Sequence, residues 1–373
     1  MGRSLNTGIW IIATGVIIAL LYIGREIFAP FALAVFLFLI VEGFARFIDE
    51  RLSLLNRAWA RGVAILVVIG GFIGFLAMMA RGIGEFGSQG DAYLQRINGL
   101  IEAIYTSLHL GNAPTLTELV FNESGQAFLG TIASATSGLT GDLVLILIYV
   151  AFLFMAQSAW PGKLDRVFSD PDRRQQVKHV GDDARRGIET YLWTQTVISA
   201  MITALTYATL LALGVENALF LSTLIFVLNY IPTIGSIVAA LVPPLFALVQ
   251  PEIAGWIPGD APNNSYVFAA LVFAGVSFWQ FSIGNFVQPR IMGDTLNLSA
   301  LVVLLGLAIW GAIWGIPGMF LSAPLTVLMM ILFAQSPSTR WIAILLSANG
   351  DPLSRESTTN LVDDASETQT LPE

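Results

Sequence analysis

The sequence has no cysteine and only two histidines among its 373 residues. Without cysteine, disulfide bridges and thiolate metal sites are excluded. His109 and His179 both lie in polar stretches, so no histidine can serve as a base or a metal ligand within an apolar segment. No His-Glu-x-x-His motif of a metalloprotease is present either. We therefore expect no metal site, no cofactor and no enzymatic activity.

Charged residues are also scarce. They make up 12% of the chain, against about 25% in a soluble domain, and the mean hydropathy is +0.73. Runs almost free of charge, such as Ile9–Ile23 and Val267–Phe286, are typical of helices that cross a bilayer. These runs are continuously apolar and do not alternate as membrane strands do. The sequence predicts an all-α polytopic membrane protein with about eight membrane elements in the lipid bilayer.

The basic residues are concentrated in two segments, 42–61 and 163–186, whereas Gly214–Glu216 and Gln250–Ser265 contain none. Because basic loops remain on the cytoplasmic side, the two basic segments and both termini are predicted in the cytoplasm. Acidic residues interrupt the second basic segment, which favours anchoring at the lipid surface over nucleic-acid binding. We expect no nucleic-acid partner.

These patterns divide the chain into six regions. Two local expectations accompany the division: Arg25-Glu26 should turn the first two spans into a hairpin, and Asp170-Pro171 should start a helix that continues into the membrane. The apolar spacing of Leu94–Leu108 predicts an amphipathic helix that packs on the bundle or lies on the bilayer. The regions are transmembrane helices in 1–80, a polar region facing outside in 81–140, a transmembrane helix in 141–160, a basic cytoplasmic helix in 161–190, a core transport region in 191–335 and an acidic disordered tail in 350–373.

Two apolar hairpins, 217–249 and 298–334, are interrupted near their midpoints by Pro and Gly, at Asn229–Ser236 and Trp314–Gly318. In lipid, the carbonyl groups freed by such a break need partners inside protein or beside water. Each hairpin follows one continuous span, and the predicted orientation brings the two in from opposite sides, as in the inverted repeats of many transporters. The short arms allow either a re-entrant hairpin or a tilted crossing of the bilayer.

Neutral polar groups at the breaks and in the span between them are the candidates for a substrate path. Asn285 and Gln288, with Gln280 near a similar face, are expected to present amides inward as one helical stripe, or else to bond neighbouring helices. The carboxylates Glu42, Asp142 and Glu216 are predicted at span ends that water reaches, so no proton relay at depth is expected. The predicted path residues are Asn229, Tyr230, Pro232, Thr233, Gly235, Ser236, Gln280, Asn285, Gln288, Gly315, Pro317 and Gly318.

Several motifs in one order resemble the autoinducer-2 exporter family: Asn229–Ser236, Gln288–Gly293, Leu296–Val302, Trp314–Gly318 and Ala323–Leu325. The resemblance covers roughly residues 10–335. Ser236 and Ala300 stand where the family often has Pro, which affects local helix geometry and removes no charge. The resemblance implies a homo-oligomeric transport protein of the bacterial inner membrane. The family name suggests a small signalling molecule as cargo, and some relatives are linked to sodium–proton exchange.

The combined prediction is an exporter of a small polar solute or signalling molecule. It would work by alternating access, with the broken hairpins around a midplane site and with H+ or Na+ as a coupling ion. A sodium–proton antiporter of the same family and a non-transporting membrane scaffold are the alternatives. Replacing Pro232 and Gly235 with Ala should leave a scaffold working and cripple a transporter.

Overall fold

The computed structural model describes residues 2–51, 57–88, 90–109, 112–115, 118, 142–250, 253, 255–256, 263–292 and 297–352. Most of the predicted polar region after residue 118 and the acidic tail from 353 lie outside this range. Within it the chain is helical, with one isolated β-bridge between Leu298 and Ser347. The helices are α1 Gly2–Ile23, α2 Arg25–Arg51, α3 Arg57–Ser88, α4 Gly90–Ser107, an apolar helix Asp142–Gln157, α7 Trp160–Val167, α8 Pro171–Leu213, α9 Ala218–Leu228, α10 Ile234–Val249, α11 Asn263–Ser282, the π-helical turn η1 Ile283–Val287, α12 Gln288–Met292, α13 Ala300–Trp314, α14 Ile316–Ala334 and α15 Arg340–Leu346.

Long apolar helices dominate the described part of the chain. Five of them are long and apolar enough to cross a membrane, and five shorter apolar helices accompany them. Large apolar side chains on their outer faces are exposed, such as Leu66 at 75% and Ile12 at 67%. Such surfaces fit lipid and not water. The predicted all-α polytopic membrane fold is confirmed.

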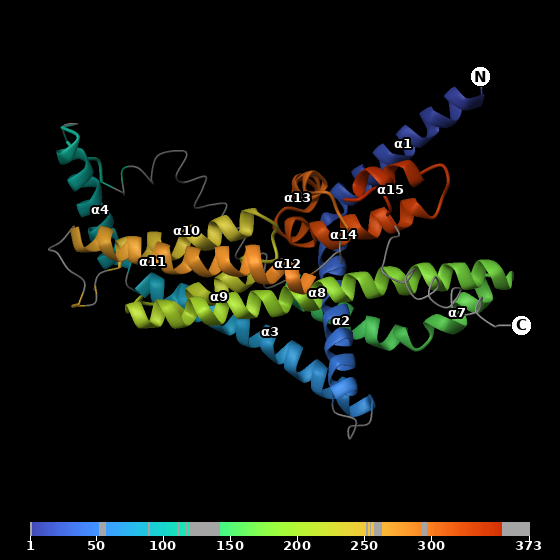
Figure 1. Ribbon diagram of the computed structural model, residues 1–373, viewed down its shortest axis with the longest axis horizontal. Coiled ribbons are helices and arrows are strands. Elements are labelled where there is room, and N and C mark those ends of the chain that lie inside the picture. Colours follow the sequence, from blue (N-terminus) through green and yellow to red (C-terminus); the bar gives the residue numbers. More distant parts are fainter. Residues whose placement is uncertain are drawn as a thin grey trace, which may run out of the picture.

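The predicted hairpin between the first two spans is wrong. Helical hydrogen bonds continue through the junction, because the Gly24 N–H donates to the Leu20 carbonyl at 2.8 Å and the Phe28 N–H donates to the Gly24 carbonyl at 2.9 Å. The chain therefore bends at Gly24 without reversing, and α1 and α2 diverge from their junction (Figure 1).

Helix α8 is the longest described element, with 43 residues, and it packs against α2, α9, α11 and α14. Its start is the predicted one: the Asp170 side chain accepts a hydrogen bond from the Asp172 N–H at 3.1 Å, and Pro171 follows. It ends at Gly214, whose φ of 79° only glycine adopts without strain. The basic segment and the following span are thus one continuous helix, as predicted.

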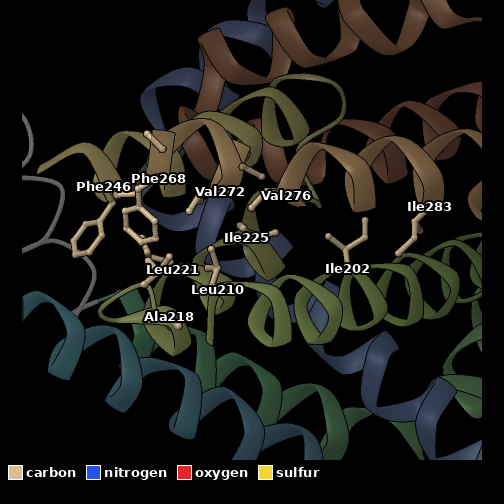
Figure 2. Close-up of a cluster of buried hydrophobic side chains, with 14 of the residues drawn as sticks. Ile202, Leu210, Ala218, Leu221, Ile225, Phe246, Phe268, Val272, Val276 and Ile283 are labelled. Carbon is tan, nitrogen blue, oxygen red and sulfur yellow. The ribbon is translucent and has the colours of Figure 1, made fainter. Parts of the chain in front are cut away.

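The main apolar core joins α8, α9, α10 and α11. Figure 2 shows side chains from these helices pointing into one interior, among them Leu210, Leu221, Phe246 and Val272. Because lipid is as apolar as this core, close packing and not water exclusion holds the helices together. The α8–α11 contact illustrates this, since a Cβ on Gly275 would lie 2.7 Å from the Thr209 methyl carbon.

Candidate functional site: two broken hairpins that meet

The first break lies between α9 and α10 and is held by short turns. The Tyr230 N–H donates to the Val227 carbonyl, and the Ile234 N–H donates to the Pro232 carbonyl at 2.6 Å. This last bond closes a three-residue turn centred on Thr233, with φ 59° and ψ −59°. A β-branched residue in this conformation is strained, and such strain persists only where the surroundings impose it.

The second break, between α13 and α14, occupies one residue, Gly315, with φ 67° and ψ −139°. Helical bonding resumes at once on both sides, from the Gly315 N–H to the Gly311 carbonyl and from the Met319 N–H to the Gly315 carbonyl. Pro317 stands in the first turn of α14, where its missing N–H removes no helical bond. This backbone conformation is open only to glycine, so the break is sharp but unstrained.

A glycine after each break allows the two arms of its hairpin to touch. A Cβ on Gly235 would lie 1.7 Å from the Leu228 carbonyl oxygen, and a Cβ on Gly318 would lie 1.9 Å from the Trp310 carbonyl oxygen. In both hairpins the glycine therefore rests on a carbonyl near the end of the preceding arm. This shared contact gives the two predicted breaks a common geometry.

The inner ends of the two hairpins meet through aromatic rings. The rings of Tyr230, at the first break, and Phe320, just after the second, stack with centroids 4.8 Å apart. Phe36 of α2 packs edge-on against both. In Figure 1, α10 extends to the left of this junction and α14 to the right. The two breaks thus belong to one buried cluster that also contains Leu192 of α8.

Polar side chains of α8 and α11 hold the first break in place. The Gln195 side-chain amide donates to the Asn229 carbonyl at 2.6 Å, and the Gln280 amide donates to the Asn229 side-chain oxygen at 3.3 Å. The Tyr230 hydroxyl shares a 2.6 Å hydrogen bond with Thr196. Sequence reasoning missed Gln195 and Thr196 because they lie inside a long helix with no visible break. The signal that could have found them is a polar series along the apolar half of α8.

The remaining predicted path residues lie at the rim of this site or away from it. Thr233 and Ser236 are exposed, and the Ser236 hydroxyl donates to the Thr233 carbonyl at 2.8 Å. Asn285 is exposed and donates to the Phe281 carbonyl of its own helix, while the Gln288 amide lies beside the Met292 sulfur. The expected inward amide stripe is therefore not formed. The π-helical turn η1 shifts the register between Gln280 and the two later amides.

A buried charge network lies between α2 and α8. Glu42 and Glu189 are 5% and 6% exposed. Arg185 donates to Glu42 at 3.1 Å and to Glu189 at 2.7 Å, and Arg46 forms an ion pair with Glu189. The prediction that water reaches Glu42 is wrong, because α2 continues as a helix to Arg51 and α8 packs along it. Glu189 was missed because it follows a segment that appeared merely basic.

At the opposite end of α8, the amphipathic helix α4 is present as predicted, but it packs on the bundle through Tyr93, whereas Leu94 and Ile104 of the predicted apolar face are exposed. The Tyr93 side chain is 2% exposed, its ring lies 5.6 Å from that of Phe246, and its hydroxyl donates to Glu216 at 3.3 Å. Burial and the neighbouring Glu216 carboxylate raise the pKa of Tyr93 to about 12. The hydroxyl therefore remains a neutral donor at physiological pH.

Comparison with known proteins decides the family. The family model described as "AI-2E family transporter" matches residues 11–338 of this chain. The chain belongs to the AI-2E transporter family. It is 29% identical over 326 residues to the "AI-2 transport protein TqsA" of Escherichia coli K12, covering 86% of this chain and 90% of TqsA. A Haemophilus influenzae protein is 28% identical over 364 residues, covering 93% and 98% of the two chains. YhhT of Escherichia coli K12 is 26% identical over 344 residues, covering 91% and 93%.

Membership in the AI-2E family makes this chain a membrane transporter or permease, a multi-pass protein of the bacterial inner membrane. The names of the family and of its relatives point to transport and not to catalysis. Within the described residues, no group of three or more His, Asp or Glu side chains is arranged to hold a metal ion. The described contacts at the two breaks are made by neutral polar side chains, aromatic rings and backbone groups.

Proposed function

We propose that this AI-2E transporter exports a small polar solute by alternating access, with the hairpins α9–α10 and α13–α14 moving around a site at the first break. The observation that carries the proposal is the ring contact between Tyr230 and Phe320, which joins the two breaks directly. Two interrupted hairpins that meet at their breaks form a junction that can close and open, as in transporters with discontinuous helices.

The length of α9 supports a re-entrant first hairpin. With 11 residues, it extends about 16 Å at 1.5 Å per residue, roughly half of a 30 Å hydrocarbon core. Its end at Asn229 would thus lie near mid-membrane if the helix starts at a membrane surface. In the proposed orientation both termini are cytoplasmic and α9 enters from outside, in accordance with the distribution of basic residues.

The cargo that we propose is a small polar signalling molecule. The relative TqsA is named an AI-2 transport protein, and the amides of Asn229, Gln195 and Gln280 at the first break suit a neutral polar solute. Sodium–proton antiport has less support. Among the residues that the structure describes, the buried carboxylates Glu42 and Glu189 are both engaged by arginine and lie between α2 and α8.

The test uses the cysteine-free chain. Tyr230→Cys and Phe320→Cys are combined and joined by a short bis-methanethiosulfonate crosslinker that a reducing agent can remove. Uptake and efflux of labelled AI-2, together with a panel of small metabolites, are measured in sealed vesicles with pH and sodium gradients imposed separately. Crosslinking should stop transport and reduction should restore it, because the junction can no longer open. The two single-cysteine variants, treated identically, are the controls.

Transport that continues at the control rate in the crosslinked protein would refute the moving junction. Transport that stops equally in both single-cysteine controls would show that the reagent, and not the bridge, is responsible.

A further inference from the structure

Helix α8 carries a polar series within its apolar half. Gln195, Ser199, Thr203 and Thr206 follow one another at spacings of four, four and three residues, which places them on one face of the helix. The first member fixes the direction of that face, because Gln195 donates to the Asn229 carbonyl at 2.6 Å. The hydroxyls therefore continue from the first break along α8 toward Gly214, on a face that they share with the buried side chains of Ile202 and Leu210. We call Ser199, Thr203 and Thr206 the hydroxyl track.

The hydroxyl oxygens of the track are buried, and the described residues leave their hydrogen-bonding capacity unused. Ser199 and Thr206 are 0% exposed, and none of the three hydroxyls has a hydrogen-bond partner among the described residues. The side-chain nitrogen of Asn229, at the start of the track, likewise has none there. Buried polar atoms of this kind normally have partners, so four together point to a ligand.

Five other hydroxyls in the same bundle behave differently, whereas the buried Ser277 hydroxyl of α11 also has no partner among the described residues. Serine and threonine in helices usually donate to a carbonyl four residues earlier, which satisfies the hydroxyl without a ligand. This bond is present for Thr196, Thr209, Ser222, Thr223 and Thr326. The hydroxyl track departs from this local pattern at three consecutive positions of one helical face.

We propose that the hydroxyl track and the Asn229 amide bind the hydroxyl groups of a neutral solute as it passes between the first break and the far end of α8. This inference rests on the proposed transport function and adds the residues and the solute class. The track would be a binding surface on α8 that offers both hydrogen-bond donors and acceptors, because each hydroxyl group can donate and accept.

The ligand class follows from the donor set. The side-chain nitrogen of Asn229 can only donate, so it repels a bare cation and favours a ligand that also accepts. No charged side chain belongs to the track, and an uncompensated charge there would be costly in an apolar interior. A neutral molecule with several hydroxyl groups matches both conditions.

The first experiment tests access in the cysteine-free chain. Ser199→Cys and Thr206→Cys are compared with Leu221→Cys and Val272→Cys, which lie on α9 and α11 in the apolar core and are 2% and 0% exposed. Each is treated in sealed vesicles with 2-hydroxyethyl methanethiosulfonate, a neutral hydroxyl-bearing reagent, and with its trimethylammonium analogue. We expect the track cysteines to react about tenfold faster than the core cysteines with the neutral reagent, and more slowly with the cationic one, because only the track is polar.

Equal reaction rates of the neutral reagent at all four positions would refute the proposal that the hydroxyl track binds the solute. If the track cysteines react with the cationic reagent as fast as with the neutral one, the proposal that the solute is neutral is refuted and a path for cations is indicated.

The second experiment separates binding from packing. Ser199→Ala, Thr203→Val and Thr206→Val remove unpartnered hydroxyls with little change in shape, so Tm should stay constant or rise. Transport of labelled AI-2 and of labelled glycerol should nevertheless fall, by about tenfold for whichever solute the parent protein carries. Thr209→Val is the matched control, because its hydroxyl is bonded to Leu205 and Trp279 and lies outside the track.

Unchanged transport in all three variants would overturn the track while leaving the moving junction intact. Conversely, loss of transport in these variants together with normal transport across the Tyr230–Phe320 crosslink would support the track and refute the hairpin motion.

Discussion

The two broken hairpins share a glycine that rests on a carbonyl oxygen, but their breaks differ in length and in polar contacts. The first is interrupted over five residues, 229–233, and centres on the strained Thr233, whereas the second is interrupted at Gly315 alone. Side chains of α8 and α11 hydrogen-bond to the first break. At the second, the described polar contact to another helix is the Trp314 indole N–H to the Leu21 carbonyl at 3.1 Å. In the proposed mechanism, the first hairpin presents polar groups to the solute and the second closes over it with apolar rings.

The shared feature of the hairpins, a glycine on a carbonyl oxygen, predicts the largest effects. Gly235→Ala and Gly318→Ala would each place a methyl carbon within 2 Å of a backbone oxygen, so the arms must separate. We expect each to lower the free energy of unfolding by about 3 kcal/mol or more, measured by thermal unfolding in detergent. A tolerated alanine at one position and not at the other would show that the two contacts are not equivalent.

The charge network outside both hairpins predicts the next largest effect. Glu189→Gln leaves Arg46 and Arg185 with one carboxylate fewer in a buried setting. Because both arginines are partly exposed, we expect a loss of about 2–3 kcal/mol. Asp165→Asn, which removes exposed ion pairs with Arg174 and Lys178, is the control and should cost at most about 1 kcal/mol. Equal effects would mean that the network does not fix α2 against α8.

The polar anchoring of the first break predicts an asymmetry in transport. Gln195→Leu removes the donor to the Asn229 carbonyl, and Trp314→Phe removes the donor to the Leu21 carbonyl. Each should cost about 1 kcal/mol of stability. Gln195→Leu should also reduce AI-2 flux in vesicles far more than Trp314→Phe does, because only the first break presents polar groups to the proposed solute. A larger flux defect in Trp314→Phe would reverse the assignment of roles.

Backbone strain predicts stability changes of opposite sign at the two breaks. Thr233→Gly relieves the strain of a positive φ and should raise the free energy of unfolding by at most about 1 kcal/mol. The gain is limited because glycine increases the conformational entropy of the unfolded chain. Gly315→Ala introduces strain at φ 67° in open space and should cost about 1–2 kcal/mol. Thermal unfolding of the pair tests this, and a change of the same sign at both positions would contradict the comparison.

Much of this architecture can be predicted from local sequence. Pro and Gly within apolar runs locate both breaks, and Asp170-Pro171 locates the start of α8. Contacts between distant elements cannot be predicted in this way. Arg185 and Glu42 are 143 positions apart, and Gln195 becomes important only because Asn229, 34 positions later, lies against it. The π-helical turn moves Asn285 off the expected face, and no local pattern announces it.

The most direct test of the moving junction is a distance measured during transport. Ile234 and Ile316 flank the two breaks and are 46% and 65% exposed, so Ile234→Cys and Ile316→Cys can both carry spin labels. Double electron–electron resonance is recorded in vesicles with and without a transported solute. We expect two distance populations whose ratio changes when solute is added. A single distance that stays the same while the labelled protein transports would contradict it.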